Sequence, residues 1–142
     1  MQKLEELVFY NLENTIKTYR QFAQKQITSS GFDITIDQWL ILKTIQENDN
    51  LAQQTIAEKV FKDVASITRI IEILVKKGYI SRSFHNDDRR RFALAITKEG
   101  EKIIDKVLPI IEQNRAQALT SLSEKDVKTL QKLLTILTKN CL

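Results

Sequence analysis

The feature that most constrains the fold is a change of hydrophobic period at Gly78. Before this glycine, large apolar residues recur every three or four positions, which indicates a helix with one buried stripe. The stripe consists of Ile67, Ile70, Ile71 and Leu74. After the glycine, residues 79–84 can form one strand, and large apolar residues alternate along 92–96, which indicates a half-buried second strand. The polar, turn-rich residues 85–91 lie between the two, so we predict a β-hairpin with a charged tip.

Helical periodicity extends over most of the rest of the chain. The 142 residues include only three glycines and one proline, so long helices form easily and an all-β fold would lack turn residues. Apolar steps of three and four predict helices over residues 4–28, 36–46, 53–61, 98–120 and from 124 onward. Pro109 should kink the fourth of these helices. Capping residues support helix starts at Thr35 with Gln38, Asp63, Thr97 and Ser123.

The order of these elements defines the expected architecture. Two short helices joined by a tight turn and followed by a hairpin are a winged helix-turn-helix. We predict one domain with a mainly α fold and a small β-hairpin wing. The winged helix-turn-helix covers about residues 33–97, with the helix-turn-helix at 53–77 and the wing at 79–97. Residues 1–30 and 98–142 carry more apolar surface than so small a module can cover, which favours dimerisation helices; the alternative is an intramolecular bundle.

The net charge of +4 is modest, but its distribution is uneven. Residues 59–91 hold nine basic and four acidic side chains, a net charge of +5, whereas the rest of the chain holds 13 basic and 14 acidic residues. The whole positive excess therefore lies within residues 59–91, about a quarter of the sequence. Clustered positive charge is typical of a protein that binds a polyanion such as DNA, and the alternative is an ordinary solvated surface.

Several classes of protein are disfavoured by what the sequence lacks. No apolar run approaches the roughly 20 residues that cross a bilayer, and the acidic, helical start does not resemble a signal peptide, so we expect a cytoplasmic protein with no membrane partner. The absence of a Gly-rich phosphate loop, a nucleophile elbow and a cluster of metal ligands argues against an enzyme, a cofactor and a metal. His85 is the one histidine and cannot form a metal site alone. Cys141 is the one cysteine, and nothing near it indicates a redox role.

Two segments carry a family resemblance. They are SITRIIEILVKKGYI at residues 66–80 and DRRRFALAITKEG at residues 88–100. The first is similar to the recognition helix, with its glycine stop, of the MarR (multiple antibiotic resistance regulator) family of bacterial transcription factors. The second resembles the wing of that family and the helix start after it, with Ile96 where leucine is usual. The resemblance covers nearly the whole chain.

The resemblance implies a homodimer whose N- and C-terminal helices interleave. It also implies a recognition helix in the major groove, a wing that reaches the flanking minor groove, and release of DNA by a small aromatic or phenolic anion in a cleft bordered by the helix of Trp39. We therefore predict a sequence-specific DNA-binding transcriptional regulator, a repressor that binds a palindromic operator as a homodimer. The alternative is a winged-helix protein–protein interaction module without sequence-specific DNA readout.

The expected DNA contacts come from four places in the chain. They are Gln53, Gln54 and Thr55 at the start of one helix, Lys62 in the turn, Ala65, Ser66, Thr68 and Arg69 on the recognition helix, and Asp88, Arg89, Arg90 and Arg91 in the wing. Arg69 lies opposite the buried stripe, where a guanidinium can donate to guanine; the alternative is an ion pair with Glu72. The hydroxyls of Ser66 and Thr68 suit phosphates or base edges, or simply a polar helix surface. The wing arginines reach DNA or belong to a solvated loop.

Overall fold

The computed structural model describes residues 1–48, 50–85 and 88–142, and the side chains of 84–92 lie outside that description. Within this part the chain forms six α-helices, a short 3-10 helix and a two-stranded antiparallel sheet, which confirms the predicted fold class. The elements are η1 (Leu4–Glu6), α1 (Val8–Ser29), α2 (Ile36–Glu47), α3 (Gln53–Lys59), α4 (Val64–Lys76), β1 (Ile80–His85), β2 (Asp88–Ile96), α5 (Lys98–Ala118) and α6 (Glu124–Asn140).

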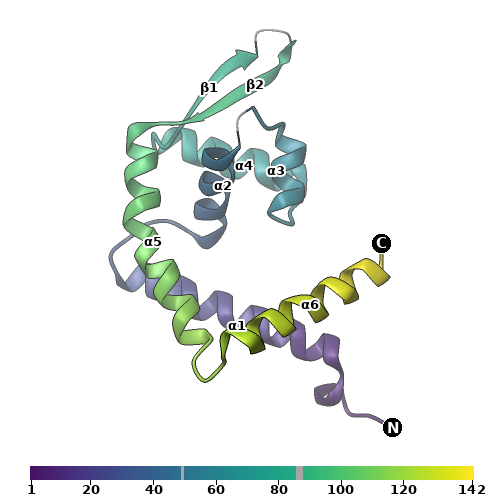
Figure 1. Cartoon of the computed structure of the whole chain (residues 1–142). Helices are drawn as coiled ribbons and strands as arrows, with labels where there is room; N and C mark the ends of the chain where they lie inside the picture. Colours follow the sequence, from purple (N-terminus) through teal and green to yellow (C-terminus); the bar gives the residue numbers. More distant parts are fainter. Residues whose placement is uncertain (49, 86–87) are drawn as a thin grey trace.

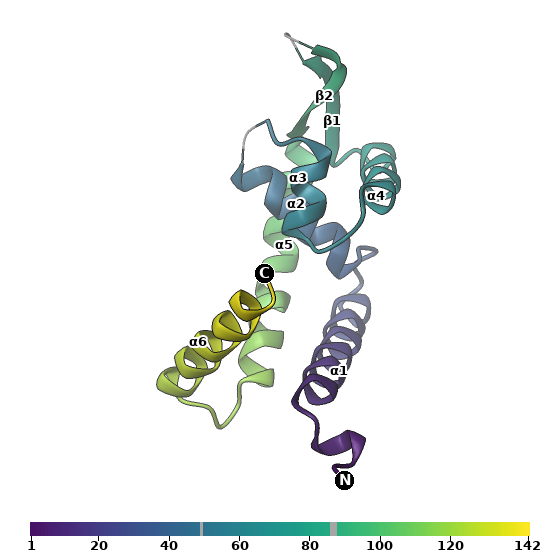
Figure 2. The same ribbon diagram turned by 90° about the vertical axis from the view of Figure 1, so that its right-hand side faces the viewer.

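The helix-turn-helix and the hairpin occupy one end of the molecule, and the terminal helices occupy the other (Figure 1). α5 runs from the base of the hairpin to the far end, where it packs along α1. α6 leaves the end of α5 and projects away from the rest of the chain. The two helices α1 and α6 overlap in Figure 1 but stand apart in the second view (Figure 2). No helix in the described part is long and apolar enough to cross a membrane.

The hydrophobic core lies between α2, α3, α4, α5 and the base of the hairpin. Its fully buried large side chains include Ile41, Leu42, Ile56, Ile67, Ile71, Leu74, Ile104 and Val107. Trp39 is 3% exposed and its indole N–H donates to the backbone oxygen of Ile104 at 3.3 Å, so it is a core residue that joins α2 to α5. The core thereby fixes the helix-turn-helix against the long helix that leads to the terminal region.

One expected helix is interrupted near its start. The sequence predicts a single helix over residues 4–28, but the backbone is extended at Leu7 and α1 begins only at Val8. The carboxylate of Glu6 accepts a hydrogen bond from the backbone N–H of Lys3 at 3.0 Å, which closes a separate 3-10 turn. That local closure ends the first turn instead of extending it into α1.

The hairpin is longer than the alternating apolar residues alone predict. β2 begins at Asp88, whereas the sequence pattern places its start at residue 92. Ile80 pairs with Ile96 and Phe84 pairs with Phe92, and the register shifts between Phe84 and His85. Because backbone groups form the ladder, a run of charged residues does not end a strand.

Close backbone packing anchors the hairpin to α5. The Thr97 hydroxyl donates to the backbone oxygen of Gly78 at 2.5 Å and accepts from the backbone N–H of Gly100 at 3.0 Å, as its predicted capping role requires. A Cβ at Gly100 would lie 2.3 Å from the backbone oxygen of Tyr79, so only glycine fits there. The wing is therefore held at a fixed position relative to α4.

The ends of α3 and α4 share one hydrogen-bonding motif. At the end of α4, Gly78 has φ of 81° and the backbone N–H of Tyr79 donates to the oxygen of Leu74. At the end of α3, Phe61 has φ of 61° and the backbone N–H of Lys62 donates to the oxygen of Ala57. Both are Schellman motifs, in which glycine is the usual left-handed residue. A residue with a side chain raises the free energy of this left-handed conformation by about 1 kcal/mol relative to glycine, so the backbone at Phe61 is strained.

Candidate nucleic-acid interface

α4 presents one face to the core and the other to solvent. Ile67, Ile71 and Leu74 are fully buried on the first face. Ala65 and Arg69 are exposed on the second, and the sequence analysis predicts both to contact DNA. No ion pair joins Arg69 to Glu72 in the described part of the chain, which leaves the guanidinium able to meet a base. Arg69 therefore lies on the solvent-facing side of α4, and its contact with DNA stays a prediction.

The two hydroxyls that were predicted to face DNA already have partners. Ser66 Oγ donates to Asp63 Oδ2 at 2.8 Å, and its backbone N–H donates to Asp63 Oδ1 at 2.8 Å, which confirms Asp63 as the N-cap. These bonds lower the pKa of the Asp63 carboxyl below its ordinary value, the backbone N–H having the largest effect. Thr68 Oγ1 lies 2.8 Å from Gln53 Oε1 and 3.0 Å from the backbone oxygen of Val64. Both hydroxyl hydrogens are thus occupied within the helix-turn-helix.

The first turn of α3 lies beside the recognition helix. Gln53 and Thr55 are half-buried, and Gln54 is exposed. The hydrogen bond between Gln53 and Thr68 joins the two helices of the motif. Gln53 therefore holds the two helices together as well as lying where a DNA contact is expected.

Lys62 lies in an ionic cluster that sequence reasoning did not predict. Its Nζ is 3.0 Å from Asp37 Oδ2, and the other oxygen of Asp37 pairs with the guanidinium of Arg20. Asp37 lies in the first turn of α2 and Arg20 belongs to α1, so one carboxylate links the terminal helix, α2 and the turn of the helix-turn-helix. Partial burial raises the pKa of Asp37, but hydrogen bonds from Lys62 and Arg20 outweigh that effect, and the pKa lies below its ordinary value.

The wing carries the remaining expected contacts. The backbone of Asp88, Arg89, Arg90 and Arg91 belongs to β2. Their side chains, like that of His85, lie outside the described residues. The expectation that these four residues contact DNA therefore stays a prediction from the sequence.

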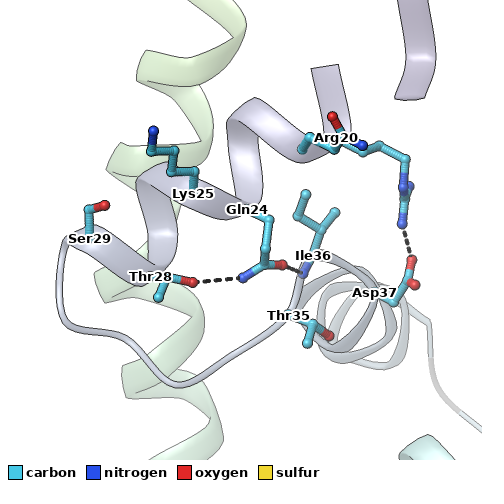
Figure 3. A pocket seen from close by; sticks show the side chains of 9 residues that line it. Arg20, Gln24, Lys25, Thr28, Ser29, Thr35, Ile36 and Asp37 are labelled. Atoms are coloured by element: carbon cyan, nitrogen blue, oxygen red, sulfur yellow. Dashed lines mark hydrogen bonds and ion pairs between the residues drawn. The ribbon is translucent and has the colours of Figure 1, made fainter. Parts of the chain in front are cut away.

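A hollow of about 560 Å³ lies between α1 and the start of α2 (Figure 3). Gln24 crosses it: its Oε1 accepts from the backbone N–H of Ile36 at 3.0 Å, and its Nε2 donates to the backbone oxygen of Ile34 at 3.1 Å and to Thr28 Oγ1 at 3.3 Å. The same view shows Arg20 reaching Asp37 at one side. The hydrogen-bonding groups of Gln24 are thus used to join α1 to α2.

A second, more enclosed cavity of about 110 Å³ lies between α1, α2 and α5. Its lining is mostly apolar and includes Ile16, Tyr19, Ala23, Ile36, Trp39, Leu40 and Ile111, together with Arg20 and Arg115. Arg20 contributes to this cavity and also pairs with Asp37, so the cavity adjoins the ionic cluster.

In the described residues, no group of three His, Cys, Asp or Glu side chains could hold a metal ion.

Comparison with known proteins identifies the fold and the family. A family model described as the MarR family matches residues 34–92, which contain the helix-turn-helix and most of the hairpin. A Bacillus subtilis protein, the uncharacterized HTH-type transcriptional regulator YhbI, is 30% identical over 139 residues, which cover 94% of this chain and 90% of that protein. The chain belongs to the MarR family. It is therefore a DNA-binding transcriptional regulator of a non-enzymatic family.

Two solved structures show how fully this MarR-family chain shares the fold. Bordetella bronchiseptica BpsR has a TM-score of 0.88 at 19% identity, covering 97% of both chains. S. aureus MepR, solved as a DNA complex, has a TM-score of 0.84 at 22% identity, covering 94% of this chain and 98% of that one. Since both matches include α1, α5 and α6, the likeness extends beyond the winged helix-turn-helix to the terminal helices.

Proposed function

We propose that this MarR-family regulator binds a palindromic operator as a homodimer and represses transcription from it. The observation that carries the proposal is the apolar surface of the terminal helices. α6, which the structure describes in full, has no buried residue, although Leu130, Leu133 and Ile136 are spaced as an apolar seam. An exposed seam of this kind supports an interface with another chain over an intramolecular bundle.

The N-terminal region adds to this surface. Its large apolar side chains Leu4, Leu7, Val8, Phe9, Tyr10 and Ile16 are exposed, Leu4 by 67% and Phe9 by 57%. Residues 1–30 and 98–142 are thus dimerisation helices in this proposal, and residues 33–97 form the DNA-binding region. A two-fold dimer presents two recognition helices to a palindrome, with half-sites about one DNA turn, roughly 34 Å, apart.

The DNA contacts follow from the position of α4. In the proposed complex Arg69 donates to a base edge in the major groove, and Gln54 in α3 faces the DNA backbone. Arg89, Arg90 and Arg91 reach the flanking minor groove and its phosphates. MepR, whose structure was solved with DNA, has the same fold, which supports this docking.

The cavity between α1, α2 and α5 is the proposed effector site. Its apolar lining with two arginines fits a small aromatic anion, because the ring is buried and the charge is met by a guanidinium. The DNA binding of BpsR is described as regulated by 6-hydroxynicotinic acid, a compound of this class. Since Arg20 also holds Asp37, an anion that draws Arg20 away would loosen α1 from the helix-turn-helix and release DNA.

Binding and release can be measured together by fluorescence anisotropy on a selected duplex. The proposal predicts steep salt dependence, with a slope of log affinity against log salt of about −0.9 per phosphate neutralised. It also predicts that 6-hydroxynicotinic acid or a hydroxybenzoic acid releases the duplex from the wild-type protein but less from Arg115→Ala. A template carrying the site should yield less transcript when the protein is added. Salt-independent binding or an increase in transcript would be evidence against the proposal. Absence of specific binding to any duplex would favour the alternative, a protein-interaction module.

A further inference from the structure

The amino end of α4 is apolar where it is exposed. Phe61 is 93% exposed in the turn before the helix, and Val64 is 45% exposed as its first residue. Ala65 is exposed beside them. In a recognition helix this end meets the base edges of the major groove. The surface that would meet them thus has three apolar side chains and few polar ones.

The polar side chains nearest to this end are not free to hydrogen-bond to bases. The hydroxyl of Ser66 donates to Asp63, and the hydroxyl of Thr68 lies within hydrogen-bond distance of Gln53 and of the backbone of α4. Both are therefore committed to the protein and cannot donate to a base without breaking an internal bond. Among the base-edge groups of the major groove, the C5-methyl of thymine is the one that an apolar side chain recognises.

Phe61 also has an unfavourable backbone conformation at its position. It takes the left-handed conformation that glycine takes at the equivalent point of α4, as the hydrogen bonds at the two helix ends show. Its side chain is 93% exposed, so core packing does not explain why a phenylalanine stands there. A strained backbone combined with an exposed aromatic ring indicates a role in binding.

We infer that Phe61 and Val64 form a thymine-reading contact at the amino end of α4. The two apolar side chains bury the methyl group of one thymine in each half-site, and Arg69 reads a different base pair further along the helix. This inference rests on the proposed docking of α4 in the major groove. Lys59, an exposed cation at the end of α3, lies beside the turn and favours the approach of DNA.

Replacing thymine by deoxyuridine tests the inference, because only the methyl group is lost and base pairing is kept. The operator is first selected from a random duplex pool, and each thymine of the half-site is then replaced in turn, symmetrically in both halves. At one position the wild-type affinity should fall about fourfold per methyl group, the size expected for burying one such group. In a protein carrying Phe61→Gly and Val64→Ala, the same replacement should have no effect.

Phe61→Gly should fold at least as well as the wild type, because glycine removes the left-handed strain, and thermal unfolding checks this. Ile73→Ala is the matched control: Ile73 is 44% exposed on the same helix, away from its amino end, and this variant should keep the wild-type response to deoxyuridine. If the wild type binds its operator specifically and no deoxyuridine lowers its affinity, the inference is wrong while the proposed function stands. The same holds if the double variant keeps the full response. If no duplex is bound specifically, both are wrong.

Discussion

Lys62 Nζ lies 3.0 Å from Asp37 Oδ2, so the turn between α3 and α4 is joined by an ion pair to the first turn of α2. The same carboxylate accepts from Arg20 of α1. A cation that the sequence analysis placed among the DNA contacts is therefore paired with a carboxylate of the protein, and this pair connects the helix-turn-helix with the terminal region. This connection lies beside the cavity that we propose as the effector site, so it is well placed to couple the two.

The first prediction concerns the pH dependence of this ion pair. Because the folded-state pKa of Asp37 lies below its ordinary value of 3.8, its contribution to stability is fully present above that value and is lost as the pH falls through the folded pKa. Asp37→Asn should therefore lower the free energy of unfolding by about 1 kcal/mol at pH 7. The difference from wild type should stay constant down to about pH 4 and shrink below it. Asp33→Asn, which alters an exposed carboxylate 3.7 Å from Lys77, is the control and should change little.

The second prediction concerns base readout by Arg69. Arg69→Ala should weaken binding to the preferred operator by about 1–3 kcal/mol and flatten discrimination at one base pair of each half-site. Binding to a panel of single-base operator variants measures this directly. Lys59→Ala, a nearby exposed cation, serves for comparison and should weaken all sequences alike. If Arg69→Ala also weakens every sequence equally, Arg69 is a phosphate contact instead.

The third prediction concerns the dimer. Leu130→Asp places a charge in the exposed seam of α6, where Leu130 is 46% exposed in the single chain, so it should separate the protomers without unfolding them. Light scattering should show the wild type as a dimer and this variant as a monomer with much weaker operator binding. Lys128→Asp, on the polar side of α6, should remain dimeric. A wild-type protein that is monomeric at micromolar concentration would rule the proposed dimer out.

The fourth prediction concerns the wing and comes from the sequence alone. Asp88 precedes Arg90 by two residues on the hairpin, so the two side chains can meet and the carboxylate can orient the guanidinium toward a narrow minor groove. Arg90→Ala should then weaken operator binding more than Arg89→Ala or Arg91→Ala does. Asp88→Ala should weaken binding as well, although it removes a negative charge near DNA. Tighter binding by Asp88→Ala would mean that Asp88 is only a repulsive surface charge.

The sequence predicts the features that depend on residues close to one another in the chain, such as helix caps and helix ends. Thr35 with Gln38, Asp63 and Thr97 cap their helices as expected, and Gly78 ends α4, because each of these roles depends on neighbours within a few residues. The change of period at Gly78 likewise predicts the hairpin. The helix interruption at Leu7 was missed because the apolar spacing continues through it.

The contacts that decide how the site works depend on packing between distant segments. Asp37 lies 25 residues from Lys62 and 17 from Arg20, and no pattern in the sequence relates the three. The hydroxyl of Thr68 was expected at the DNA surface, but the packing of α3 against α4 brings it to Gln53. Phe61 fits the apolar pattern of a helix end, and only its backbone conformation and exposure mark it as unusual.

The most direct test of the account is selection of duplexes from a random pool by the purified protein, followed by measurement of the binding stoichiometry. The account predicts enrichment of a palindrome whose half-site centres lie about 10 base pairs apart, bound by two protomers per duplex. Enrichment of no sequence, or of a site without two-fold symmetry bound by one protomer, would contradict it.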